Sequence, residues 1–226
     1  MERVILLTRV FDVFFSLLAV IILTPFMIPI MIGLKLTGEH DIFYGQSRVG
    51  KGGKEFKLLK FATMLRNSPN LPGGLFTADH DPRMLPMGPF LRKTKINELP
   101  QLLNILVGQM SIIGYRPQVR KQYEFFPKED QEVMKTDVPG LSGLGAVVFR
   151  DEEEMLRKVP NHEEFYEKVI SPYKSKLECW YIKNKSLKNY FVLIGLTIKA
   201  VLNPGDDSWK RLEGLPPMPD ELKPYL

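Results

Sequence analysis

Hydrophobic residues are concentrated near the N-terminus, in an unbroken run from Val13 to Leu34. The run reads VFFSLLAVIILTPFMIPIMIGL and holds 22 residues without one charge. As a helix it would extend about 33 Å, which matches the hydrocarbon thickness of a bilayer. The pattern therefore predicts a membrane-embedded helix, and a buried core helix or a cleaved signal peptide fits it less well.

Two features predict that this helix does not simply cross the bilayer. Pro25 and Pro29 lie inside the run and each removes a backbone donor, so we expect a break near Thr24 and Pro25. The hydroxyl of Ser16 or Thr24 could bond a carbonyl that a proline frees. Basic residues flank both ends, which places both ends on the cytoplasmic side. We predict a re-entrant helix-break-helix over residues 1–36, with a kinked single span as the alternative.

Residues 37–226 are expected to form a cytoplasmic domain. Residues 42–64 contain two strand-like runs around a glycine-rich turn, which is typical of a β-hairpin. Leucines at helical spacing predict a helix from Glu98 to Val107, with Pro100 in its first turn and Asn97 as its N-cap.

The C-terminal half is predicted to be mainly helical. Residues 138–149 read as loop and strand, an acidic stretch after residue 150 begins a helix, and residues 172–202 hold two more helices. The last of these, around YFVLIGL, is flanked by lysines and fits either an interfacial amphipathic helix or packing on the core. The fold class expected is α/β or α+β: a small, mostly helical core with a short β-hairpin, plus the membrane helix.

Composition narrows the partners. The formal net charge is +5, and Lys and Arg are scattered, which suits an anionic bilayer surface and argues against nucleic acid. Cys179 is the single cysteine of the sequence, so no disulfide forms within the chain and a reducing compartment is expected. The three histidines are far apart and no Cys-x-x-Cys pattern occurs, which argues against zinc.

Several stretches together resemble the bacterial sugar transferase family, the monotopic phosphoglycosyl transferases. They are the proline-broken N-terminal segment, then RVGKGGKEFKLLKFATM, DPRMLPMGPFLRKTKINELPQLLNILVGQMSIIGYRP and PGLSGL. The resemblance implies transfer of a phosphosugar from a UDP-sugar to a polyprenol phosphate, usually undecaprenyl phosphate, with Mg²⁺ and release of UMP. It also implies a place on the cytoplasmic face of a bacterial inner membrane and a role in starting O-antigen, capsule, exopolysaccharide or glycoprotein glycans.

The resemblance also assigns site residues. In the family a helix opens with an Asp-Glu pair, in which the aspartate is the nucleophile and the pair helps to hold Mg²⁺. Glu98 matches the glutamate and would be the Mg²⁺ ligand, whereas Asn97 stands at the nucleophile position. The resemblance further implies substrate contacts by Arg92, Gln101, Arg116 and Pro117. Without it, each of these residues reads as an ordinary surface, capping or turn residue.

The catalytic motif is degenerate at further positions. Ala62 stands where the family has Arg, Gln109 where it has Asp, and Tyr115 where it has Pro. The late helical region, near Cys179 and Tyr190, lacks acidic residues usual in the family. Together these changes remove carboxylates and a guanidinium from the site that the resemblance implies.

The neutral side chain of Asn97 leaves three hypotheses open. An amide oxygen is a poor nucleophile and a poorer Mg²⁺ ligand than a carboxylate. The chain could still be a transferase, with Glu98 as nucleophile or base or with direct attack by the polyprenol phosphate. It could instead be a catalytically silent homologue that binds nucleotide-sugar or polyprenyl phosphate, forms a homo-oligomer or partners an active transferase. In the third hypothesis the ligand is new. Transferase activity is the leading hypothesis, because most relatives on such a fold are enzymes.

Overall fold

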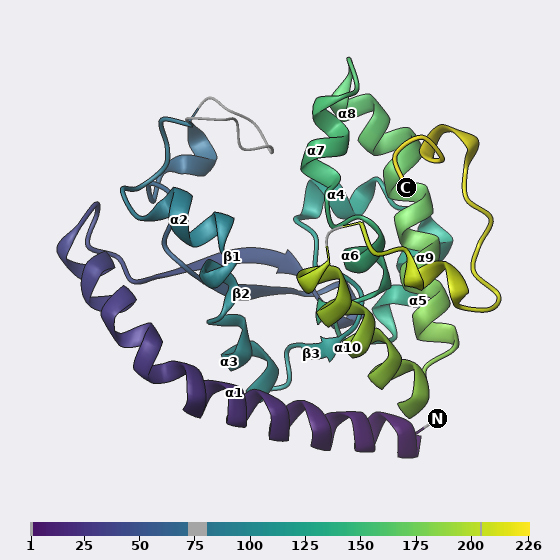
Figure 1. Cartoon of the computed structure of the whole chain (residues 1–226), viewed down its shortest axis with the longest axis horizontal. Helices are drawn as coiled ribbons and strands as arrows, with labels where there is room; N and C mark the ends of the chain where they lie inside the picture. The colour runs from purple at the N-terminus through teal and green to yellow at the C-terminus, as the bar shows by residue number, and fades with distance from the viewer. Residues whose placement is uncertain (1, 72–80, 204) are drawn as a thin grey trace.

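The computed structural model describes residues 2–71, 81–203 and 205–226, and shows an α+β fold (Figure 1). The strands are β1 (Phe43–Val49), β2 (Glu55–Phe61), β3 (Ser111–Ile113) and β4 (Gly140–Ser142). The α-helices are α1 (Glu2–Leu36), α2 (Gly88–Lys93), α3 (Gln101–Leu106), α4 (Arg120–Glu124), α5 (Lys128–Lys135), α6 (Leu144–Val148), α7 (Glu152–Arg157), α8 (His162–Phe165), α9 (Ser171–Lys183) and α10 (Leu187–Leu202). Short helical turns are η1 (Lys51–Gly53), η2 (Ser68–Asn70), η3 (Ile96–Glu98), η4 (Tyr166–Ile170), η5 (Ser208–Arg211) and η6 (Asp220–Leu222).

The predicted hairpin is confirmed. Strands β1 and β2 pair antiparallel, with Val49 opposite Glu55 next to the turn and Phe43 opposite Phe61 at the far end. Gly52 and Gly53 in the turn have φ of 69° and 73°, a left-handed conformation that glycine adopts without a Cβ penalty. The glycine-rich segment is therefore a tight turn, as its composition predicts.

A second, two-stranded sheet joins distant parts of the chain. Strands β3 and β4 are parallel, with Ser111 opposite Gly140 and Ile113 opposite Ser142. The connection between them carries α4 and α5. The two backbones meet so closely after β3 that a Cβ on Gly140 would lie 2.1 Å from the nitrogen of Gly114. The glycines in this apolar stretch therefore serve a close backbone approach.

The break predicted near Thr24 and Pro25 is wrong, because α1 runs as one helix through both prolines. Figure 1 shows that it curves around the domain instead of stopping. Each proline removes a single helical hydrogen bond, and packing of the helix on the domain holds the turns on either side. The Thr24 hydroxyl donates to the carbonyl of Val20 at 2.6 Å, one residue before the carbonyl that Pro25 frees.

One buried carboxylate attaches α1 to the domain. The Asp12 side chain is 3% exposed, and its Oδ1 atom accepts three hydrogen bonds. The donors are the hydroxyl of Ser111 at 3.0 Å, the amide of Ile112 at 2.9 Å and the hydroxyl of Tyr190 at 2.8 Å. One turn earlier, Arg9 donates to the last carbonyls of α3. The first half of α1 is thus bound to α3, β3 and α10.

The second half of α1 packs on the same domain. Leu34 is buried with Phe61 of β2 and Leu91 of α2, and apolar side chains one and two turns earlier pack against this cluster. The outward side of α1 carries large exposed hydrophobic residues: Ile5, Leu6, Leu7, Val10, Phe14, Leu17, Leu18, Ile21, Ile22, Phe26, Ile28, Ile32 and Leu36. Within the described residues, α1 is the single helix long and apolar enough to cross a membrane.

Packing of α10 on the core is confirmed, and its interfacial role stays a prediction. Tyr190, Leu193 and Leu196 are buried in the largest core cluster, together with residues of α6 and α9. The other side of α10 exposes Phe191, Ile198, Val201 and Leu202. The proline-rich tail, which has no sequence periodicity, also joins this core through Trp209 and Leu222.

Replacing Asp12 tests the attachment of α1. Asp12→Ala leaves three donors without their acceptor, so we expect the free energy of unfolding to fall by about 3 kcal/mol. Thr24→Ala removes an exposed bond within the same helix and should cost less than about 0.5 kcal/mol. Denaturant unfolding of the detergent-solubilised chain measures both. Equal effects of the two substitutions would contradict the anchoring role of Asp12.

Candidate functional site

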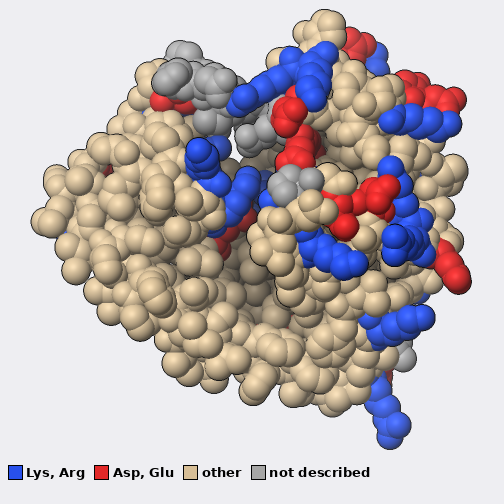
Figure 2. Space-filling view, in the orientation of Figure 1, with Lys and Arg blue, Asp and Glu red and all other residues tan. Residues whose placement is uncertain are grey.

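Four segments that are distant in sequence bring one carboxylate and three cations together. Arg48 comes from β1, Lys60 from β2, Glu98 from η3, and Arg116 follows β3. Figure 2 shows a hollow at the centre of this face, with Lys and Arg side chains at its edge. We call Arg48, Lys60, Glu98 and Arg116 the charged cluster.

The turn that carries Glu98 differs from its sequence prediction. Asn97 and Glu98 lie in η3, and the cap of α3 is Pro100, without a side-chain cap. Lys95 before η3 is left-handed, with φ of 59°, so the chain reverses before a helix can begin. Asn97 is therefore not the N-cap of α3: the helix begins at Gln101, three residues after the expected start at Glu98, and Pro100 takes the cap position. Glu98 points from a tight turn and not from a helical N-terminus.

Glu98 is the negative centre of the cluster. Its Oε1 atom lies 3.6 Å from a guanidinium nitrogen of Arg116 and 3.7 Å from Nζ of Lys60. Burial alone would raise the pKa of Glu98, but the positive charges of Arg116 and Lys60 outweigh it and lower the pKa to about 2. Glu98 is therefore ionised at neutral pH.

Lys60 and Arg48 were missed by the sequence analysis, because their partners are far along the chain. Burial lowers the pKa of Lys60 to about 7, although Glu98 opposes this shift. Burial and the neighbouring Arg116 lower the pKa of Arg48 to about 10. The one available signal was Lys60 itself, a lysine inside a strand-like apolar run two residues before Ala62.

Arg48 is held in place and keeps a free donor. It donates to the carbonyl of Pro117 at 3.0 Å and to the side chain of Gln46 at 2.8 Å. Its Nε atom is buried without a hydrogen-bond partner in the structure. Pro117 therefore acts through its backbone, as an anchor for Arg48, and the side-chain donor of Arg48 remains available to a ligand.

Asn97 also carries a buried atom without a partner. The residue is 8% exposed, and its Oδ1 atom makes no hydrogen bond. Buried polar atoms are nearly always paired, so an orphan next to a charged cluster indicates a place for a ligand group. The structure thus puts the neutral amide where the sequence comparison expects a nucleophile, directly before Glu98.

A second set of buried charged residues lies next to Arg116 and contacts its backbone. The backbone amide of Arg116 donates to Oε1 of Glu178 at 3.1 Å. Glu178 is 2% exposed, and burial raises its pKa to about 7. Nearby, Lys174 pairs with Glu152 and lies over the rings of Phe149 and Tyr166. The Glu98 carboxylate raises the pKa of the Arg116 guanidinium, so Arg116 is a permanent cation.

Two other predicted contact residues lie at different distances from this cluster. Arg92 lies in the last turn of α2, and its charge is among those that lower the pKa of Lys60. Gln101 is buried at the start of α3, and no hydrogen bond joins its side chain to the charged cluster. The structure therefore adds Arg92 to the positive field and gives Gln101 a packing position.

Gln109 and Ala62 have separate surroundings. Gln109 is exposed and accepts a hydrogen bond from Asn104, whose side chain also bonds the backbone of β2 at Lys57 and Leu59. Its side chain therefore contacts the α3–β2 junction through Asn104, and its expected place in the site stays a prediction. Ala62 is buried just after β2, two residues beyond Lys60 and so on the same side of the chain.

The donor set does not fit a tightly held Mg²⁺ ion. Mg²⁺ prefers anionic oxygen ligands in octahedral geometry. Within residues 2–71, 81–203 and 205–226, no group of three His, Cys, Asp or Glu residues could hold a metal ion. Glu98 is the one carboxylate of the charged cluster, and Lys60 and Arg116 already lie against it. No chemical step is therefore assigned to a metal.

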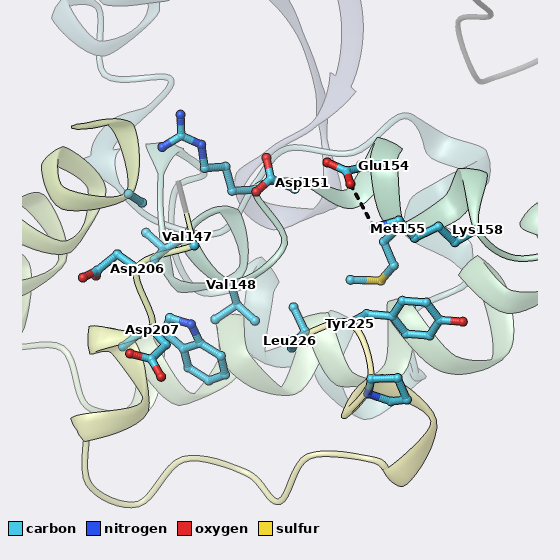
Figure 3. A pocket seen from close by; sticks show the side chains of 15 residues that line it. Val147, Val148, Asp151, Glu154, Met155, Lys158, Asp206, Asp207, Tyr225 and Leu226 are labelled. Atoms are coloured by element: carbon cyan, nitrogen blue, oxygen red, sulfur yellow. Dashed lines mark hydrogen bonds and ion pairs between the residues drawn. The ribbon is translucent and has the colours of Figure 1, made fainter. Parts of the chain in front are cut away.

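A separate cavity lies between α6, α7 and the C-terminal tail. Its volume is about 310 Å³. Figure 3 shows an apolar wall with Val148, Met155 and Leu226. At the rim, Glu154 pairs with Lys158 at 2.9 Å. No residue of the charged cluster lines this cavity, so the cluster is taken as the candidate site.

The sequence is similar to several proteins of polysaccharide synthesis. An exopolysaccharide production protein of Sinorhizobium fredii is 32% identical over 85% of this chain and 84% of the relative. The undecaprenyl-phosphate galactose phosphotransferase of Salmonella typhimurium is 32% identical over 87% of this chain. The UDP-N-acetylgalactosamine-undecaprenyl-phosphate N-acetylgalactosaminephosphotransferase of Aeromonas hydrophila is 32% identical over 86% of it. The chain spans 40% of the Salmonella protein and 43% of the Aeromonas protein.

A family model agrees with these relatives. The model for bacterial sugar transferases matches residues 3–204, which include α1, the hairpin and the whole charged cluster. The match thus covers the elements that build the site as well as the apolar helix. This chain belongs to the bacterial sugar transferase family.

Proposed function

We propose that the chain transfers a phosphosugar from a UDP-sugar to undecaprenyl phosphate at a membrane surface, as the first step of a surface glycan. The charged cluster carries this proposal. A sugar diphosphate and a lipid phosphate are both anionic, and their reaction needs positive charge around the phosphorus. Arg48, Lys60 and Arg116 supply such charge around Glu98. The printed functions of the Salmonella and Aeromonas relatives support the same reaction class.

The transfer balances by two routes. In the direct route, an oxygen of the lipid phosphate bonds to the sugar-bearing phosphorus, and the bond to UMP breaks with its electron pair leaving on UMP. In the two-step route, the Glu98 carboxylate bonds to the sugar-bearing phosphorus while the bond to UMP breaks, with its electron pair leaving on UMP. An oxygen of the lipid phosphate then bonds to this phosphorus, and the bond to Glu98 breaks and restores the carboxylate. Glu98 is ionised at neutral pH, as the second route requires. Asn97 cannot take this part, because an amide oxygen carries no negative charge.

We also propose that α1 lies in one leaflet, on the cytoplasmic face of the inner membrane, with both ends on the same side. Asp12 anchors its first half to β3 and α10, and Leu34 packs its far end against β2 and α2. If α1 crossed the bilayer, one of these two contacts with the domain would have to lie on the opposite side of the membrane. Figure 2 supports this placement, since the lower surface along α1 has few charged side chains.

One observation favours a second candidate function. Asn97 is buried and carries no charge, whereas a nucleophile at this position would be a charged carboxylate. The site could therefore bind its ligands without turning them over. A silent homologue of this kind would hold nucleotide-sugar or lipid phosphate for an active partner. The two functions share one binding surface and differ in turnover, which a single assay measures.

Release of UMP tests the proposed transfer. We expect the purified chain in lipid nanodiscs to release UMP from UDP-galactose or UDP-N-acetylgalactosamine only when undecaprenyl phosphate is present. Asn97→Asp should raise the rate at least about tenfold, or about 1.4 kcal/mol of activation free energy, by supplying a charged attacker. Glu98→Gln should lower it, and a phosphosugar adduct on Glu98 in the mass spectrum would distinguish the two-step route. Turnover by Asn97→Asp alone would instead support the silent homologue, and no turnover by either form would refute the reaction.

The pH dependence of binding tests the role of Lys60. Its pKa of about 7 means that the free site is fully charged below pH 7 and loses one cation as the pH rises through this value. Affinity for UDP-galactose, whose diphosphate does not titrate in this range, should be constant from pH 5.5 to about 6.5. It should then fall by up to about tenfold per pH unit above 7. Lys60→Arg keeps its charge and should flatten the profile in a calorimetric titration; an unchanged slope in this variant would assign the dependence to another group.

Labelling of engineered cysteines tests the placement of α1. Glu2, the first residue of α1, and Glu39, which lies beyond its last residue, are each replaced by cysteine. The native Cys179 is buried and should not react. A membrane-impermeant maleimide should label both positions in inverted vesicles and neither in intact cells. Lys210→Cys, exposed in the tail, reports the side of the domain. Labelling of positions 2 and 39 from opposite sides would establish a single crossing.

A further inference from the structure

The carboxylate of the charged cluster is already paired with two cations. Lys60 and Arg116 lie 3.7 and 3.6 Å from the same oxygen atom of Glu98. The side chain of Gln109 is bound to Asn104 at the α3–β2 junction. A divalent ion approaching Glu98 would displace two ion pairs and meet their positive charges at close range.

The charge of the cluster matches a bare diphosphate. Three cations and one carboxylate leave a formal charge of +2 when Lys60 is protonated. The diphosphate of a nucleotide-sugar carries two negative charges, so it would neutralise the cluster. An added Mg²⁺ ion would instead leave an excess of two positive charges in a half-buried site, which is unfavourable.

Hydrogen-bonding capacity at the site points to the same ligand. The Nε atom of Arg48 is a buried donor without a partner, and a phosphate oxygen is a suitable acceptor for a guanidinium. The Asn97 side chain is buried directly before Glu98 in the chain, and its neutral amide does not repel a phosphate as a carboxylate would. An aspartate here would repel phosphate unless a metal ion lay between them.

Resting on the proposed function, we propose that this chain binds the diphosphate of its nucleotide-sugar with Arg48, Lys60, Arg116 and the Asn97 amide in place of a divalent metal. The substitution at position 97 then changes the mode of diphosphate binding as well as the nucleophile. A site with two adjacent carboxylates needs a metal ion to approach phosphate. A site with one carboxylate, one amide and three cations does not.

The experiment compares binding with and without divalent metal. Calorimetric titration of the full chain in nanodiscs with UDP-galactose and UDP-N-acetylgalactosamine is run in excess MgCl₂ and in excess EDTA. The wild-type affinity should differ by less than about twofold between the two buffers. Asn97→Asp should bind well in MgCl₂ and lose at least about tenfold in EDTA, because its second carboxylate requires a metal bridge. Titration of the wild-type chain with MgCl₂ alone should show no saturable binding.

Charge-removing variants locate the effect. Lys60→Met should weaken nucleotide-sugar binding at least about tenfold in both buffers. Lys57→Met, on the same strand three residues earlier and exposed, is the matched control and should bind like wild type. A tenfold or greater loss of wild-type affinity in EDTA would overturn the inference while leaving the proposed function standing. Absence of nucleotide-sugar binding in both buffers would overturn the proposed function and this inference with it.

Discussion

The three hydrogen bonds that converge on one oxygen of Asp12 set the position of the rest of the site. A carboxylate within an apolar helix is costly unless donors replace its water, and the donors here come from β3 and α10. Strand β3 continues into the segment that carries Arg116, and its partner β4 leads to the turn beside Glu178. The apolar helix α1 and the charged cluster are therefore joined through β3, which fixes the position of the cluster relative to the apolar surface of α1.

Within the site, the pKa of each ionisable group depends on burial and on the neighbouring charges more than on the type of side chain. Glu98 has its pKa lowered to about 2, although burial opposes this, because Arg116 and Lys60 stabilise its charge. Lys60 has a pKa near 7 because burial disfavours its charge more strongly than Glu98 favours it. Glu178, behind Arg116, has a pKa raised to about 7 by burial and no partner for its second oxygen. The site thus holds one fixed anion and two groups that can exchange protons near neutral pH.

The sequence predicts those features that depend on local pattern. The hairpin, α7, α9, α10 and the long apolar helix follow from hydrophobic period and turn residues, whereas residues 144–148, which read as loop and strand, form α6. It fails where distant segments decide the outcome. Lys60 and Glu98 are 38 positions apart, and only the packing of β2 on η3 makes them partners. The break at Pro25 is wrong because the domain supports α1 on both sides of it, and the cap role of Asn97 is wrong because Lys95 reverses the chain before α3 begins.

The replacement at position 97 bears on Lys60 as well as on the attacker. Position 97 is adjacent to Glu98, within range of the same cations. A second carboxylate there would stabilise the charge of Lys60 and oppose the burial that lowers its pKa. With asparagine, burial prevails, and the ammonium of Lys60 becomes the group that adjusts its proton to the charge of whatever is bound. The neutral side chain at position 97 and the pKa of Lys60 near 7 therefore belong to one electrostatic balance, and the proposed binding of a diphosphate would raise this pKa.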